Sequence, residues 1–416
     1  MSAAIPTQRR GGAESGVAAR ALLNGRFERI SCAQRKPLWS VTIWDKKFNS
    51  VATGKQTTAI KYHYLLAGDL KEKIVPGGNV KLLTTSETDW WTTEDKVSGL
   101  VSEGEIVSIP WGGNPNVQYF KGRFVTADNR IATSSDKTVL DNKFLYYFML
   151  AKRNTIGSFY RGAGLKHPEM SKVLDMEIPL PNIEAQRAFV RCMDNVSKVI
   201  AARKMQLDSL SQLVKSRFVE MFGDGSKWPA EDMENLCYLI TDGEHATPKR
   251  VEKGILLLSA RNVLDHALKL DDVDYIDQEE YDRIAKRIVP QEGDVLLSCS
   301  GSVGRCCTVP SDIKFQMVRS VALLRLKETL LPKFVEYLIC SPHVQSQIDK
   351  LKTASSQANL FQGKIKKLKG FVPPLAIQRE FAAFVEKVDK LAFAVRKSLE
   401  SAEKLYRQQL SEAFAC

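Results

Sequence analysis

The side chains best suited to chemistry in this chain gather in short loops that mix Gly, Lys or Arg, amide, hydroxyl and aromatic residues. Cationic side chains and backbone N–H groups bind phosphates, whereas amides, hydroxyls and guanidinium groups bind base edges, so this mixture favours nucleic-acid recognition. The candidate DNA contacts in the first half are Trp111, Asn114, Arg130, Arg161, Lys166 and His167. Those in the second half are His245, Thr247, Lys249, Arg261, Asn262, Ser300, Ser302 and Arg305. Each loop could also be an ordinary surface turn, and a tryptophan is more often part of a core.

Motifs for catalysis are absent from the sequence. Pro373-Pro374 has no acidic or amide residue before it and no aromatic residue after it, unlike the motif that holds the target amino group in adenine methyltransferases. Asp312-Ile313-Lys314 lacks the acidic partner that a Mg²⁺-dependent nuclease needs. No GxxxxGK[ST] loop is present, and the histidines and cysteines do not have metal-ligand spacing. We expect no catalytic residues, no metal site and no cofactor.

The bulk composition favours a cytoplasmic protein with a polyanionic partner. A chain of 416 residues with 44% hydrophobic residues is long enough for two or three domains. Its 60 Lys and Arg residues outnumber 48 Asp and Glu residues, for a net charge of +12, and nucleic acid is a common partner of such a surface. Eight cysteines without paired spacing suit a reducing compartment. No apolar run approaches the roughly 20 residues of a membrane span.

One long segment occurs twice. Residues 178–222 recur without a gap as residues 370–414, at a constant offset of 192. Twelve identical residues recur at that offset, among them Pro181, Gln186, Phe189 and Phe222, which match Pro373, Gln378, Phe381 and Phe414. The period is too long for a solenoid repeat. The chain is therefore expected to have two related halves, each closed by one copy.

Each copy predicts one long helix. Apolar residues recur three, four or seven positions apart from Ile183 to Phe222, with no Gly or Pro between, and the second copy repeats this stripe. Asn182 is a suitable N-cap, and Gly223 follows the last helical residue. Because the two stripes correspond position by position, we expect the helices to pack as an antiparallel coiled coil. The alternative is that each helix packs only on its own globular neighbour.

The regions between the helices predict strands. Residues 104–111, 121–127, 254–260, 293–300 and 320–326 are rich in β-branched and other apolar residues and bounded by turn signals. We expect an α+β fold in which two globular regions of mixed or antiparallel strands with helices are separated by the helix pair. The expected segments are an N-terminal tail over 1–26, globular regions over 27–177 and 228–369, a central helix and linker over 178–227, and a C-terminal helix over 370–416.

These motifs resemble those of the DNA specificity (S) subunits of type I restriction-modification systems. The resemblance covers nearly the whole chain after residue 25. In the first half it rests on TIWDKKFN, IPWGGNPNVQYFKGRFVTADNRIATS and FYRGAGLKHPEMSKVLDMEIPLP, and in the second on DGEHATP and GDVLLSCSGSVGR. Both helices also start after a Pro-rich segment followed by Gln186 or Gln378. Two departures are Ile377, where an acidic residue is usual, and a longer N-terminal tail.

The resemblance implies a sequence-specific subunit without catalytic activity of its own. It implies two target-recognition domains that each read one half-site of double-stranded DNA, and a coiled coil that sets the unread spacer. It further implies two methyltransferase (M) subunits that transfer methyl groups to adenine, and restriction and translocation (R) subunits. We expect the partners to grip the repeated frame at Gln186, Arg187, Phe189, Gln378, Arg379 and Phe381.

Two other classes of function stay open on the sequence. The first is a helical scaffold that assembles proteins without reading DNA. The second is a nuclease or methylase active by itself, which the missing motifs argue against. Sequence-specific retention of duplex DNA distinguishes the specificity subunit from the scaffold.

Overall fold

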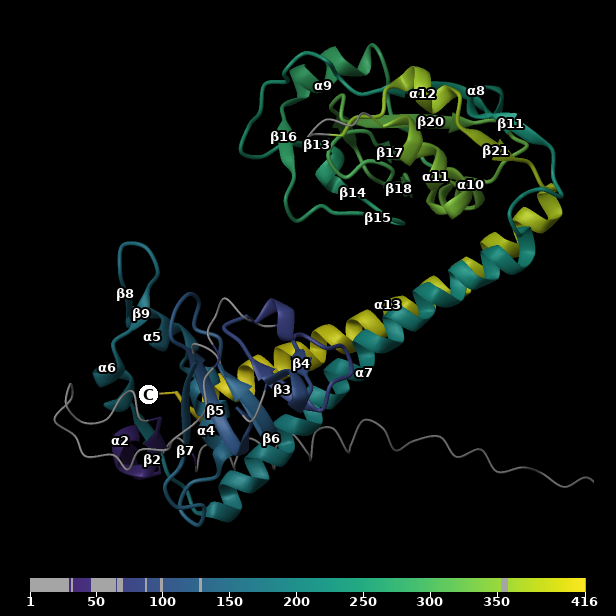
Figure 1. Cartoon of the computed structure of the whole chain (residues 1–416). Coiled ribbons are helices and arrows are strands. Elements are labelled where there is room, and N and C mark those ends of the chain that lie inside the picture. The colour runs from purple at the N-terminus through teal and green to yellow at the C-terminus, as the bar shows by residue number, and fades with distance from the viewer. Residues whose placement is uncertain are drawn as a thin grey trace, which may run out of the picture. The chain divides into compact units, whose positions relative to one another are not determined.

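The structure is a computed structural model of the chain (Figure 1), and it describes residues 30, 33–45, 65, 70–86, 88–97, 100–126, 129–352 and 358–415. The chain folds into two compact units. Unit 1 contains Met1–Arg203 and Ser398–Cys416, and unit 2 contains Lys204–Lys397. The expected N-terminal tail over 1–26 lies outside the described residues. Each of the two long helices passes from one unit into the other.

Unit 1 has a six-stranded sheet beside two long-helix segments. Its elements are β1 (Arg35–Pro37), α2 (Leu38–Val41), β2 (Thr42–Trp44), η3 (Lys71–Lys73), β3 (Val80–Leu83), β4 (Trp90–Thr92), α3 (Glu94–Val97), β5 (Ser102–Pro110), β6 (Gln118–Thr126), β7 (Asn129–Ser134), α4 (Asn142–Ala151), α5 (Arg153–Ser158), β8 (Tyr160–Arg161), β9 (His167–Pro168), α6 (Met170–Leu174), β10 (Glu177–Pro179) and the start of α7 (Ile183–Phe222). The sheet order is β2-β7-β5-β6-β3-β4, and every pair is antiparallel except β3 with β6.

Unit 2 repeats part of this order in a smaller sheet. Its elements are β11 (Ala230–Asp232), α8 (Met233–Leu236), β12 (Cys237–Asp242), β13 (Ile255–Leu258), η4 (Ala260–Asn262), β14 (Val263–Leu264), β15 (Ala267–Leu268), β16 (Asp274–Ile276), α9 (Gln278–Ala285), β17 (Val295–Ser298), β18 (Cys306–Thr308), β19 (Phe315–Met317), β20 (Val321–Leu326), α10 (Pro332–Cys340), α11 (Pro342–Leu351), α12 (Gln362–Lys366), β21 (Lys369–Phe371) and the start of α13 (Leu375–Ala413). The antiparallel sheet β12-β20-β17-β18 has the connectivity of β2-β7-β5-β6, and a second sheet has the order β16-β13-β19.

The two units share a common frame around their chain boundaries. In unit 1, β1 pairs antiparallel with β10, and the Leu38 amide donates to the Met176 carbonyl at 2.9 Å. In unit 2, β11 pairs antiparallel with β21, and the Met233 amide donates to the Leu368 carbonyl at 2.8 Å. Each short ribbon ties the first strand of a unit to the segment that leads into its long helix. The duplication therefore extends beyond the repeated helices into the backbone of both units.

One buried glutamine joins each long helix to its unit. Gln186 accepts from the Asp141 amide at 3.0 Å and donates to the Val139 and Pro181 carbonyls, both at 2.8 Å. Gln378 makes the equivalent set, accepting from the Leu331 amide at 2.9 Å. It donates to the carbonyls of Thr329 at 2.9 Å and Pro373 at 2.8 Å. Both side chains are fully buried, so these bonds satisfy glutamine amide groups that water does not reach.

Phenylalanines complete the same joint. In unit 1, Phe189 near the start of α7 contacts Phe144 of α4 and Phe414 beyond the end of α13, with ring centroids 5.6 and 5.4 Å apart. In unit 2, Phe381 near the start of α13 contacts Phe222 at the end of α7 at 5.5 Å. Phe222 also contacts Phe334 of α10 at 4.9 Å. Each unit is thus built on the start of one long helix and the end of the other.

The prediction of an antiparallel coiled coil is confirmed. Along α7, Phe189, Cys192 and Arg203 meet positions of decreasing number around α13: Phe414, Gln409 and Ser398. In unit 2, Arg217 of α7 pairs with Glu380 of α13 at 2.7 Å. The helix bounds also match the apolar stripes, and the Asn182 side chain caps α7 by accepting from the Ala185 amide at 2.9 Å.

Replacement of a frame glutamine is expected to destabilise the protein. Gln378→Ala removes the hydrogen-bond partner of the Leu331 amide and of two carbonyls and leaves a cavity at a fully buried position, which should lower the free energy of unfolding by about 1–3 kcal/mol. Urea denaturation followed by circular dichroism measures this change. The adjacent exposed Arg379→Ala is the control and should stay within about 0.5 kcal/mol of the parent. Equal stability of the two variants would contradict the role given to the buried amide.

Candidate nucleic-acid interface

In unit 1, two segments distant in sequence form one surface. The loop after β5 contains Trp111 and Asn114, and the β8–β9 hairpin follows α5. The Tyr160 hydroxyl donates to the Pro110 carbonyl at 2.6 Å, and the Gly113 amide donates to the Lys166 carbonyl at 3.2 Å. Burial raises the pKa of Tyr160, so the hydroxyl keeps its proton for this bond. The hairpin is therefore held against the loop by backbone and buried side-chain contacts.

A stack of side chains lies under this surface. The Arg130 guanidinium lies 4.0 Å from the Trp111 ring centroid, and the His167 ring lies 5.0 Å from it. His167 Nδ1 is also 2.7 Å from the Trp111 carbonyl oxygen. Arg130 is only 3% exposed and lies 3.5 Å from the buried Asp45 carboxylate. The expectation that Arg130 contacts DNA is corrected on this point: its side chain supports Trp111 from below the surface.

The remaining candidates of unit 1 lie on the solvent side. Asn114, Arg161 and Lys166 are exposed, and Trp111 and His167 are half-buried. Arg161 pairs with Glu169 at 3.1 Å, and Lys172 binds the same carboxylate at 2.6 Å. Lys172 and Arg161 together lower the pKa of Glu169, which therefore stays ionised and orients both cations. The hairpin thus presents the exposed Arg161 and Lys166 side chains beside the half-buried aromatic rings of Trp111 and His167.

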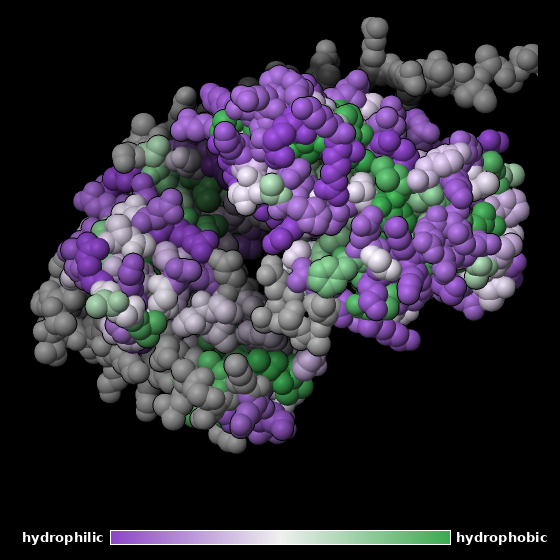
Figure 2. All heavy atoms as spheres, turned by 90° about the horizontal axis from the view of Figure 1, so that it is seen from above, coloured by the Kyte–Doolittle hydropathy of each residue, from purple (hydrophilic) through white to green (hydrophobic). Residues whose placement is uncertain are grey.

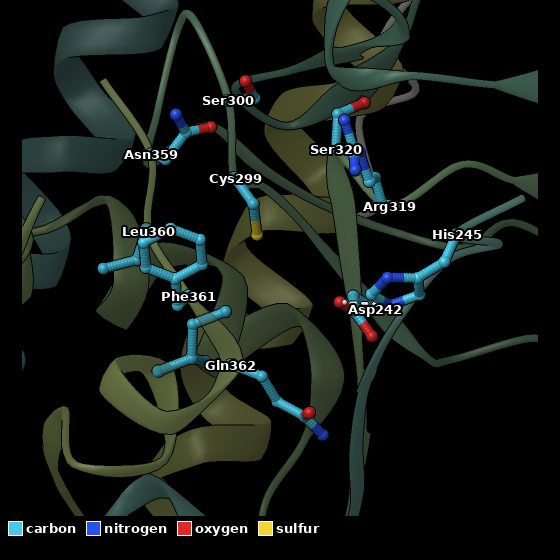
Figure 3. A pocket seen from close by; sticks show the side chains of 11 residues that line it. Asp242, His245, Cys299, Ser300, Arg319, Ser320, Asn359, Leu360, Phe361 and Gln362 are labelled. Carbon is cyan, nitrogen blue, oxygen red and sulfur yellow. Dashed lines mark ion pairs between the residues drawn. The ribbon is translucent and has the colours of Figure 1, made fainter. Parts of the chain in front are cut away.

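In unit 2, two of the expected loops border one recess (Figure 3), which has a volume of about 450 Å³. Asp242 is the last residue of β12, and its Oδ2 lies 2.9 Å from Nε2 of His245 in the segment that follows. Ser300 lies on the opposite loop, where it forms a bridge with Asn359. Other lining residues are Cys299, Arg319, Ser320, Leu360, Phe361, Gln362 and Ile365. His245 and Ser300 are therefore brought together, as parts of one site.

The charge state of the recess follows from its contacts. Burial alone would raise the pKa of Asp242, but hydrogen bonds from His245 and Arg287 outweigh it and hold the pKa below its usual value. The carboxylate is therefore ionised and anchors both neighbours. Burial raises the pKa of Cys299 to about 12, so this thiol is neutral and contributes an apolar floor.

The other candidates of unit 2 are spread over neighbouring loops. Ser298 Oγ donates to the Ser302 carbonyl at 2.6 Å and accepts from the Arg305 amide at 2.9 Å, which ties the turn between β17 and β18. Thr247 and Lys249 border a separate groove beside α9. Arg261 is exposed but pairs with Asp274 at 2.9 Å. The recess thus gathers only part of the candidate set.

Asn262 is a second correction. Its side chain is fully buried and accepts from the Ser259 amide at 2.9 Å. It also donates to the Lys269 carbonyl at 2.9 Å and the Asp272 carbonyl at 2.8 Å. With its bonding capacity used inside the protein, Asn262 shapes the loop that carries Arg261. It does not present an amide to a ligand.

Several residues of the recess were not among the sites expected from the sequence. Of these, Arg319 and Phe361 are exposed, and neither lies in a motif with a recognisable spacing. Arg319 precedes a buried strand by two residues, and Phe361 precedes a short helix. The only local signal was the polar segment 355–360, of which residues 355–357 lie outside the described residues.

Four of the six expected partner contacts are also corrected. Gln186, Phe189, Gln378 and Phe381 are at most 3% exposed and form the joints described above. Their identity in both copies reflects the shared internal packing of two units. Arg187 and Arg379 are exposed and stay candidates.

Within the described ranges, no group of three or more His, Cys, Asp or Glu side chains is arranged to hold a metal ion. Cys306 and Cys307 lie in β18 and belong to different core clusters, on opposite sides of the sheet. None of the described helices has the length and apolarity needed to cross a membrane.

The chain belongs to the family described as the type I restriction modification DNA specificity domain, which matches residues 34–212 and 272–402. The fold agrees with this membership. The chain thus has the role of a type I specificity subunit in DNA recognition.

Similar proteins are named specificity (S) subunits. The type I restriction enzyme MjaVIII specificity subunit of Methanocaldococcus jannaschii is 19% identical over 333 residues, covering 73% of this chain and 77% of that protein. The EcoBI specificity subunit of Escherichia coli is 22% identical, covering 75% and 69%. The crystal structure of the type I restriction-modification S subunit from M. genitalium covers 92% of this chain and 96% of that chain, with 16% identity and a TM-score of 0.58. The structural likeness shows a shared fold.

The β8–β9 hairpin offers a test with an internal control. Gly162 has a φ of 139°, and a Cβ there would lie 2.7 Å from the Leu165 carbonyl oxygen. Gly162→Ala is therefore expected to open the hairpin locally. Because local opening exposes the backbone to protease, tryptic cleavage after Arg161 and Lys166 should be about tenfold faster. A Cβ on Gly164 meets no atom within 4 Å, so Gly164→Ala should be cleaved at the parent rate. Equal cleavage of both variants would contradict the close packing of the hairpin.

Proposed function

We propose that this chain recognises a bipartite, asymmetric DNA target and directs methyltransferase and restriction subunits to it. In this proposal, the target-recognition domains span 27–177 and 228–369, and each reads one half-site. Lysines and arginines neutralise phosphates along both domains, while a smaller set of side chains contacts base edges. The chain itself carries out no catalysis, and adenine methylation belongs to the partners.

The observation that carries the proposal is the contrast between the frame and the loops. Both units keep the same ribbon, the same buried glutamine and the same strand connectivity. Their surfaces differ: unit 1 presents a hairpin beside a Trp–His pair, and unit 2 presents a recess. Equivalent frames with different surfaces fit two readers of different half-sites.

The long helices support a spacer function in this proposal. α7 has 40 residues and α13 has 39, and both are uninterrupted. Because each helix begins in one unit and ends in the other, a change in helix length alters the connection of both readers without touching either recognition surface. In this proposal, the length of α7 and α13 sets the number of unread base pairs between the two half-sites.

Exposed apolar side chains on the helices support a protein partner. On α7, Met205 is 70% exposed and Val219 57%, and on α13, Leu391 is 58% and Phe393 57% exposed. On the face in Figure 2, hydrophilic residues predominate and hydrophobic residues form separate groups between them. These exposed apolar positions are our candidates for contact with a protein partner. We propose that the methyltransferase subunits pack here and that the restriction subunits join this assembly in the cytoplasm.

A scaffold that does not read DNA is the alternative. It would account for the helix surface but not for the exposed Arg161 and Lys166 beside the Trp111 and His167 aromatic surface. Retention of a specific duplex by the chain with its methyltransferase decides between the two.

Mapping methylated adenines in DNA tests the proposal. The parent complex should methylate a target with two fixed half-sites and a fixed spacer. Deletion of residues 196–202 and 399–405, which leaves the exposed apolar residues named above in place, removes two turns, or about 10 Å, from each helix. We expect a spacer shorter by about one to three base pairs and unchanged half-sites.

The equal-length variant Ser209→Ala is the control for this deletion and should keep the parent spacer. Altered half-site bases in the shortened chain would contradict the separation of spacing from reading. Methylation without any fixed target would contradict the proposed function itself.

The helix surface predicts a loss of assembly. Phe393→Asp places a charge at one of these exposed apolar positions of α13 and should weaken binding of the methyltransferase subunit by about tenfold or more. Titration monitored by analytical ultracentrifugation measures this affinity. Val289→Asp, at a 43% exposed valine of unit 2 away from the helices, is the matched control and should bind as the parent does. Parent-like assembly of Phe393→Asp would remove this part of the helix from the interface.

A further inference from the structure

We propose that the recess of unit 2 receives one nucleobase of the DNA target after that base has left its stack. The proposal rests on the proposed function and adds the ligand class and the residues that bind it. The volume of about 450 Å³ lies within the range of small-molecule sites. None of the DNA contacts expected from sequence requires such a recess, since base edges can be read in a groove by side chains on a convex surface.

The chemistry of the walls fits a flat heterocycle. The floor consists of Cys299, Leu360 and Ile365, which are at most 6% exposed, and the Cys299 thiol is neutral. Phe361 is 64% exposed at the rim, so the face of its ring is open to a flat ligand. A stacked base offers only its edges, so contact of its faces with this floor and ring requires that it leave the stack.

The rim also carries polar groups suited to a base and its phosphate (Figure 3). Asp242 binds His245 Nε2 at 2.9 Å, so the imidazole is held in one orientation with its Nδ1 edge available to a ligand. Arg319 is exposed, and among the described residues no carboxylate lies within ion-pairing distance of its side chain. Its backbone amide is held by the Glu244 carbonyl at 3.0 Å. We assign Arg319 to the phosphate beside the extruded base and His245 to the base edge.

The segment that bears Phe361 is fixed in place. The Leu360 amide donates to the Cys299 carbonyl at 2.9 Å, and the Gln362 amide side chain donates to the Ile240 carbonyl. Because both neighbours of Phe361 are bound, to Cys299 and to Ile240, the backbone that presents the aromatic ring as a platform is fixed at the rim of the recess. Base–aromatic stacking on such a platform is tolerant of sequence, so the polar rim supplies the discrimination.

Fluorescence of 2-aminopurine tests the inference in the assembled complex with its methyltransferase subunits. The probe replaces each purine on both strands of the mapped half-sites in turn, and its emission rises when it or the base beside it leaves the stack. Apart from the adenine to be methylated, we expect the emission to rise several-fold in one half-site only. Phe361→Ala should abolish this rise and weaken binding by about tenfold or more.

Tyr238→Ala is the matched control, because Tyr238 is 61% exposed in unit 2 but does not line the recess. It should keep both the rise in emission and the parent affinity. Specific binding without any such rise, or a full rise in Phe361→Ala, would overturn the inference and leave the proposed function intact. Binding that fails to distinguish the mapped target from an unrelated duplex would overturn both.

Discussion

The rest of the structure depends on how each long helix is joined to its unit. A buried glutamine amide satisfies one backbone N–H and two carbonyls at the start of the helix, through Gln186 in unit 1 and Gln378 in unit 2. A buried polar group without such partners would cost about 1–3 kcal/mol, so the amide allows only one docking geometry. The end of the other helix then completes each joint through Phe414 or Phe222. The two ends of the repeat are thereby locked into different units.

This arrangement separates stability from recognition. The joints lie in the cores, and the candidate reading residues lie on loops between strands that the cores hold in place. Loops of this kind tolerate changes that the frame does not. One unit can therefore carry a hairpin with Arg161 and Lys166 while the other carries a recess with His245 and Arg319. In the proposed function, this division lets two identical partners bind a symmetric frame above an asymmetric target.

Local patterns predicted the helices and strands well. The apolar stripes and Asn182 defined α7, and residues 254–260, 293–300 and 320–326 each contain a strand. Local patterns did not predict which polar residues are buried in the folded chain. Arg130 and Asn262 are of residue types that bind DNA, but both are buried: Arg130 pairs with Asp45, and Asn262 caps the turn after Ser259. Recurrence of Gln186 and Phe189 in the second copy suggested a partner surface, whereas their burial identifies a shared joint. Phe361 lacked any spacing signal because its site forms only when distant strands meet.

If the frame carries two independent readers, one reader can be exchanged without affecting the other. In a hybrid chain, residues 233–368 are replaced by the corresponding segment of another member of the family, and β11, β21 and both long helices are kept. The methylated targets of parent and hybrid are then mapped in the same host DNA. We expect one half-site to change while the other half-site and the spacer stay the same. A change in both half-sites or in the spacer would contradict it.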